Sequence, residues 1–113
     1  MAFERFTEIG QSFKPKISIW ANGGQIGFNQ GAMKKYKLEN YQYAILFFDK
    51  ENKRIGIRFT NDENEEGANK FNHVRGVISG KAFLDCYGID YSKTNRYDVA
   101  FDQEDDLYII NLE

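Results

Sequence analysis

Apolar and polar residues alternate in short runs along the first sixty positions, which predicts strands joined by tight turns. Ile17 and Ile19 fall on one face of a strand over 16–20. The turn signal Asn22-Gly23-Gly24 follows, because Asn and Gly adopt positive φ at little cost, and the chain returns over 25–28. Further strands are predicted over residues 3–9, over the apolar run 41–48, and over the alternating residues 54–59. The unbroken run over 41–48 is typical of a strand buried on both faces.

A short helix is predicted between these two hairpins. Asn29 is placed to cap it, since an Asn side chain accepts a hydrogen bond from a free N–H of the first turn. The helix is expected to reach about residue 36, with Ala32, Met33 and Tyr36 on its buried stripe.

The second half of the chain repeats this order of elements. Residues 31–38 match residues 82–89 in apolar pattern at an offset of 51, and residues 46–59 match residues 99–112 at an offset of 53. We therefore predict repeat unit one over about 16–59, an acidic connecting loop over about 60–67, and repeat unit two over about 68–112.

Repeat unit two is expected to follow the same plan in detail. Its strands are predicted over 68–71, 76–78, 96–101 and 107–112. Ser79 is expected to cap its helix, which runs to about residue 87 with Phe83, Leu84 and Tyr87 facing inward.

The expected fold is a single domain over residues 1–113, mainly β with two short helices. Apolar residues make up 42% of the chain and aromatic residues 16%, enough for a packed core. A unit of about 50 residues cannot bury its apolar face alone, so the two units are expected to complete one small pseudo-twofold β-barrel.

A unit of hairpin, short helix and second hairpin resembles the swapped-hairpin module of AbrB-type transition-state regulators and MazE-type antitoxins. The resemblance is carried by residues 19–28, 29–38 and 43–59 and recurs in the second half. It implies a cradle-loop barrel, here formed by two units of one chain. Family members that bind DNA use basic residues on the loop between the first strands and the adjoining helix. Here the loop over 21–25 lacks a cation, and its counterpart offers His73 and Arg75.

Charge is distributed unevenly between the halves, although the net charge is only −2. Residues 1–60 carry 10 Lys and Arg against 5 Asp and Glu, and residues 61–113 carry 5 against 12. Three interpretations are open: a basic surface for an anionic partner, a head-to-tail contact between copies, or ordinary surface variation between duplicated halves.

The resemblance and the basic first half lead to the hypothesis of a nucleic-acid-binding regulator or antitoxin-like protein, with DNA as its partner. The alternative is a non-enzymatic protein–protein interaction module, with a protein partner or a second copy bound by the acidic second half or by aromatic strand edges. The candidate nucleic-acid-binding residues are Lys14, Lys16, Asn22, Gln25, Lys34, Lys35, Lys37 and Arg75. Trp20, Tyr41, Tyr43 and Tyr91 either fill the core or stack on bases or a partner.

We expect no catalytic residues, cofactor or metal site. One histidine (His73) and one cysteine (Cys86) provide neither a metal-ligand spacing nor a disulfide, and Cys86 is expected to be a small core residue. The acidic residues 102–106 lack EF-hand spacing and predict a solvated turn. Asp49 and Asp102 recur at the same point of both units, as expected of carboxylates that start turns.

A cytoplasmic location without membrane contact is expected. No run of the sequence approaches about 18 consecutive apolar residues. Residues 1–6 do not resemble the apolar segment of a signal peptide.

Overall fold

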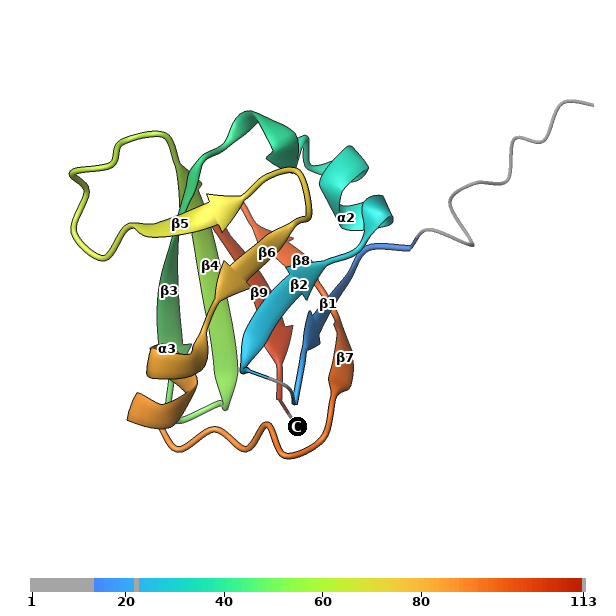
Figure 1. Ribbon diagram of the computed structural model, residues 1–113, viewed down its shortest axis with the longest axis vertical. Helices are drawn as coiled ribbons and strands as arrows, with labels where there is room; N and C mark the ends of the chain where they lie inside the picture. Colours follow the sequence, from blue (N-terminus) through green and yellow to red (C-terminus); the bar gives the residue numbers. More distant parts are fainter. Residues whose placement is uncertain (1–13, 22, 113) are drawn as a thin grey trace, which may run out of the picture.

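The computed structural model describes residues 14–21 and 23–112, which form short strands and helices (Figure 1). The predicted strand over 3–9 lies outside these residues. The elements of the first half are β1 (Lys16–Ile19), β2 (Gln25–Phe28), α2 (Gln30–Lys35), the 3-10 helix η1 (Leu38–Asn40), β3 (Tyr43–Asp49) and β4 (Arg54–Thr60). Those of the second half are β5 (Asn69–Asn72), β6 (Val77–Ser79), α3 (Lys81–Cys86), β7 (Asn95–Asp98), β8 (Ala100–Asp102) and β9 (Leu107–Asn111).

The strands form a nearly closed antiparallel barrel. Among the described residues the strand order is β7-β1-β2-β6-β5-β3-β4-β9-β8, and every neighbouring pair is antiparallel. The two ends of this order, β7 and β8, follow each other in the chain with only Val99 between them. Figure 1 shows β5, β6, β2 and β1 on one side of the barrel and β3, β4 and β9 behind them. The predicted mainly β fold with two short helices is confirmed.

The pairing pattern has pseudo-twofold symmetry. In β2 and β6, Ile26 pairs with Ile78, its equivalent at an offset of 52. On either side, Gln25 pairs with Ser79 and Gly27 pairs with Val77, and at the same offset each of these two pairs is the equivalent of the other. In β4 and β9, Gly56 likewise pairs with Ile109, its equivalent at an offset of 53. Each repeat unit adds its first strand to the other unit, because β1 pairs with β7 and β5 pairs with β3.

The barrel interior is filled by residues from both units. Strand alternation sends apolar side chains inward, and the helices add Ala32, Leu38 and Leu84. The hydrophobic residues exposed by 2% or less are Ile17, Ile19, Ile26, Ala32, Leu38, Ala44, Ile55, Ile57, Phe71, Ile78, Leu84 and Ile110. At one end Phe28, Phe59 and Phe71 meet edge to face, with ring centroids 4.9–5.9 Å apart. Such pairs are the preferred geometry of aromatic rings and link strands of the two units.

Helix α2 begins as the sequence predicts. Asn29 Oδ1 accepts a hydrogen bond from the Ala32 N–H at 2.9 Å and another from the Lys16 N–H at 3.1 Å. The Asn29 amide group also donates to the Lys14 carbonyl at 2.7 Å. Asn29 therefore fixes the start of the helix relative to β1 as well as capping it. The helix ends at Lys35, one residue before the expected end.

The expected cap of α3 is wrong. Ser79 is the last residue of β6, and Gly80 occupies the cap position without a side-chain hydrogen bond. A Cβ at Gly80 would lie 2.7 Å from Ile26 Cδ1, so the tight packing of this turn on β2 leaves no room for a capping side chain. The helix consequently starts one residue later than a Ser79 cap would place it.

Three expectations about burial are corrected. Cys86 is exposed rather than in the core, because it faces away from the single fully buried residue of α3, Leu84. Tyr87 is 41% exposed, although its ring packs against Phe48 with centroids 4.9 Å apart. Strand β3 is not buried on both faces along its length, since Phe47 is 38% exposed on its outer face.

The turns of the two long hairpins are alike, as the recurring aspartates predict. Asp49 Oδ1 accepts hydrogen bonds from the N–H groups of the second and third residues after it, and Asp102 Oδ1 does the same. Lys53 and Asp106 then adopt positive φ, at 54° and 55°. The Asp49 carboxylate also accepts from the side chains of Asn52 and Arg54, and these hydrogen bonds lower its pKa to about 2.

Candidate nucleic-acid interface

The outer surface of β2, β6 and β5 contains a groove of about 540 Å³. In these strands Ile26, Ile78 and Phe71 face the core, so the residues on either side of them face outward. The groove is lined by Gln25, Lys70, Phe71, Asn72, His73, Arg75, Val77 and Ser79. Its walls therefore combine cationic groups with amides and a hydroxyl around an apolar floor.

The groove has a positive charge. Lys70, His73 and Arg75 are all exposed, and none of them forms an ion pair with another described residue. Within residues 14–21 and 23–112, no carboxylate lines the groove. Ammonium and guanidinium groups that lack protein partners are free to contact an anion such as a phosphate.

The turn between β5 and β6 presents Arg75 and the neighbouring His73. Asn72 Oδ1 accepts hydrogen bonds from the N–H groups of Val74 and Arg75, at 3.2 and 3.1 Å. Gly76 then adopts a φ of 71°, and its carbonyl accepts from the Phe28 N–H at 2.7 Å. The turn is thus held against β2, which keeps Arg75 beside the groove.

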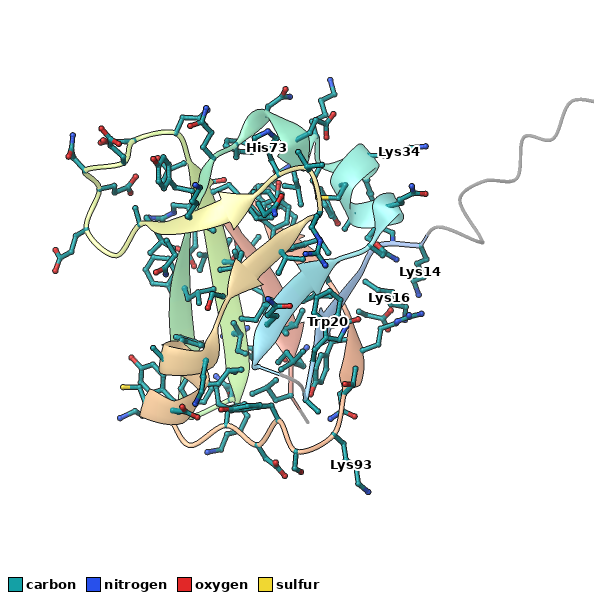
Figure 2. All side chains as sticks on the ribbon, viewed as in Figure 1. Lys14, Lys16, Trp20, Lys34, His73 and Lys93 are labelled. Atoms are coloured by element: carbon teal, nitrogen blue, oxygen red, sulfur yellow. The ribbon has the colours of Figure 1, made fainter. Side chains whose placement is uncertain are left out.

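Two of the residues that the sequence singled out meet in this groove. Gln25 and Arg75 line it. Asn22 lies outside the described residues. Lys34 and Lys35 are exposed at the end of α2, and Lys37 is exposed just after it. The Lys35 ammonium lies 5.6 Å from the centroid of the Tyr36 ring, which packs on Tyr108 of β9. Helix α2 itself packs on the β5–β6 turn through Met33. This contact is close, because a Cβ at Gly76 would lie 3.0 Å from Met33 Sδ. Figure 2 shows Lys34 and His73 at the same end of the barrel.

Lys14 and Lys16 are engaged elsewhere. Both form ion pairs with Asp98 of β7, with Lys14 Nζ 3.6 Å from the carboxylate and Lys16 hydrogen bonded to it. The hydrogen bond from Lys16, and after it the charge of Lys14, lowers the pKa of Asp98. Their charges are therefore partly compensated, and they contribute less to an anion site than Lys70 or Arg75.

The symmetry-related surface on unit one differs from the groove among the described residues. At the pseudo-twofold-related position of unit one, Trp20 stands in place of Asn72 and Gly27 in place of Ser79. The Trp20 indole lies over Gly27, where a Cβ would come within 2.6 Å of its Cη2 atom. Unit one thus has an aromatic side chain where unit two has the open, cationic groove.

Lys70, Asn72 and Ser79 were not predicted from the sequence. His73 was noted on the counterpart of the DNA-binding loop but was not among the candidate nucleic-acid-binding residues. The available signal was the strand alternation of residues 69–72, in which the buried Phe71 sends both neighbours outward. Lys70 was overlooked because it belongs to the acidic half of the chain.

Other kinds of site find no support in residues 14–21 and 23–112. These residues contain no group of three or more His, Cys, Asp or Glu side chains that could hold a metal ion. A helix with the length and apolar character needed to cross a membrane is also absent from them. Comparison of the chain with protein-family models, curated proteins and solved structures finds no match.

Proposed function

We propose that the chain is a nucleic-acid-binding protein of the regulator or antitoxin-like kind, and that the groove on β2, β6 and β5 is its contact surface. The observation that carries this proposal is the pair of exposed cations Lys70 and Arg75, with the exposed His73 beside them, within a groove whose described lining contains amides and a hydroxyl but no carboxylate. Cations supply phosphate contacts, and amide and hydroxyl groups are the usual partners of sugars and base edges.

The number of available cations determines how strongly binding should depend on salt. Lys70 and Arg75 neutralise about two phosphates, and a nucleic acid long enough to reach Lys34, Lys35 and Lys37 as well would raise this number to about five. For duplex DNA the slope of log affinity against log salt is then about −2 to −4.5, since each neutralised phosphate contributes about −0.9. A slope of this size corresponds to weak binding at physiological salt and measurable binding at low salt.

The proposal is tested by fluorescence anisotropy with a labelled oligonucleotide over a series of salt concentrations. Lys70→Glu is expected to weaken binding at least tenfold at low salt, because it replaces a phosphate contact by repulsion. Lys93→Glu is the matched control, since Lys93 is also exposed but lies at the opposite end of the barrel from His73 (Figure 2). Absence of binding at low salt, or equal losses in both variants, would refute the proposal.

A second candidate function, protein–protein contact, is favoured by a different surface. On the outer face of β3, β4 and β9, Phe47, Leu107 and Ile109 surround a cavity of about 150 Å³ whose rim includes Asp102 and Asp105. An apolar patch rimmed by charge is typical of protein interfaces. Under this alternative, charge reversal within 102–106 weakens self-association or partner binding and leaves the behaviour of Lys70→Glu unchanged.

A further inference from the structure

Trp20 lies on the outside of the barrel. Ile17 and Ile19 of β1 point into the core. Because side chains alternate between the two faces of a strand, Trp20, which directly follows Ile19, points outward. The Trp20 N–H donates to the Gln25 carbonyl at 2.9 Å, which holds residue 20 beside β2. Its indole rests on Gly27, is partly exposed, and does not belong to the hydrophobic core formed by the described residues.

Trp20 stands at one end of a row of outward-facing polar residues. It pairs with Gln25, and Gln25 pairs with Ser79 of β6. The register of β5 and β6 places Lys70 opposite Ser79, one residue beyond the Phe71–Ile78 pair. Neighbouring strands lie about 4.8 Å apart, so the backbones at Trp20 and Lys70, three strand spacings apart, are separated by about 14 Å along the curved sheet.

This arrangement suits an unpaired nucleotide strand better than a duplex. Single-stranded nucleic acid is bound by aromatic side chains that stack on bases and by cations that follow the backbone. In a duplex the bases are stacked on one another and reach a protein aromatic ring only when they are flipped out. A sheet surface with a partly exposed indole at one end and an ammonium group at the other supplies both contacts.

Resting on the proposed function, we infer that the ligand is single-stranded nucleic acid, with one base stacked on the Trp20 indole and the adjoining phosphates bound by Lys70 and Arg75. Gln25 and Ser79, which lie between them, supply the amide and hydroxyl groups that hydrogen bond to base edges or sugar hydroxyls.

Trp20 is the only tryptophan in the chain, so intrinsic fluorescence reports on this site directly. Titration with oligothymidylate or oligouridylate at low salt is expected to quench the emission of Trp20. The oligonucleotide that binds more tightly shows whether the natural ligand is DNA or RNA. A blunt duplex of the same length is expected to bind more weakly and to leave the emission nearly unchanged.

Two variants separate stacking from folding. Trp20→Ala is expected to weaken binding of the labelled single strand about 5- to 150-fold, whereas Trp20→Phe, which retains a stacking face, loses less. Far-ultraviolet circular dichroism checks that both variants keep the barrel. Both are measured by anisotropy, because neither contains a tryptophan.

The outcomes distinguish this inference from the proposed function. Two results overturn the stacking site and leave the proposed function intact. One is salt-dependent binding that is lost in Lys70→Glu but unaffected by Trp20→Ala, and the other is binding that does not quench the Trp20 emission. Failure of both single strands and duplex to bind at low salt overturns the two together.

Discussion

Adding a methyl group at Gly27 is expected to displace the Trp20 indole from the sheet. A Cβ at this position would lie 2.6, 2.9 and 3.2 Å from three atoms of the six-membered ring, well inside van der Waals contact. Overpacking of this kind costs about 1–3 kcal/mol. Exchange of a strand glycine for alanine separately stabilises the fold by about 0.5–1 kcal/mol, because glycine loses more conformational freedom on folding.

A double-mutant cycle isolates the contact between the two residues. In the Trp20→Ala background the clash is gone, so Gly27→Ala should become stabilising by about 0.5–1 kcal/mol. The backbone term is the same in both backgrounds and cancels, which leaves a coupling free energy of about 1–3 kcal/mol. Urea unfolding followed by far-ultraviolet circular dichroism measures all four proteins, including those without a tryptophan.

The cycle also has a clear opposing result. If Gly27→Ala changes the free energy of unfolding equally in both backgrounds, within about 0.5 kcal/mol, the indole does not rest on residue 27. The inferred stacking site would then lose its structural support. A red shift of the Trp20 emission in Gly27→Ala alone provides an independent check, since a displaced indole becomes more exposed to water.

Three further results are expected. Phe71→Ala should lower the free energy of unfolding by about 3–5 kcal/mol in chemical denaturation, while Phe101→Ala, at a side chain already 38% exposed, should cost much less. Asn29→Ala should cost about 1–2 kcal/mol by the same measurement through loss of the α2 cap, and Ser79→Ala should stay within about 0.5 kcal/mol because Ser79 does not cap α3. The pKa of Asp49, about 2 against an ordinary 3.8, means that its stabilising contribution is complete above about pH 4 and lost as the pH falls through 2. Carboxyl titration by NMR should show this ionisation, and the stability difference from Asp49→Asn should shrink over the same interval.

The fold was largely predictable because its signals are local. Strand alternation, the glycine turn and the Asn29 cap each depend on neighbouring residues, and the repeated pattern supplied the symmetry. The predicted Ser79 cap was wrong because the two kinds of element repeat at different offsets. The first hairpins of the units repeat at an offset of 52, so Ser79 corresponds to Gly27 in β2. The helices repeat at an offset of 51, so Gly80 corresponds to the capping residue Asn29. A one-residue difference of this kind is not visible before the strands are paired.

The candidate site was less predictable because it depends on which strands become neighbours. Gln25 and Lys70 are 45 positions apart and meet only because β2 pairs with β6 and β6 with β5. Counting charge along the sequence drew attention to the basic first half. In the folded chain, Lys16 of that half is compensated by Asp98, whereas Lys70 of the acidic half is left without an ion partner among the described residues.

The crosswise pairing of the repeat units has a consequence for assembly of the protein. Four of the eight ladders within residues 14–21 and 23–112 join one unit to the other, and the exposed segment 61–67 between the units takes no part in them. Half of these ladders can therefore form only after distant segments find each other, which slows folding relative to a chain of local contacts. The same interlocking means that a nick within 61–67 would leave two fragments held together by their shared hydrogen bonds, and that two copies could trade halves at high concentration without losing a single ladder.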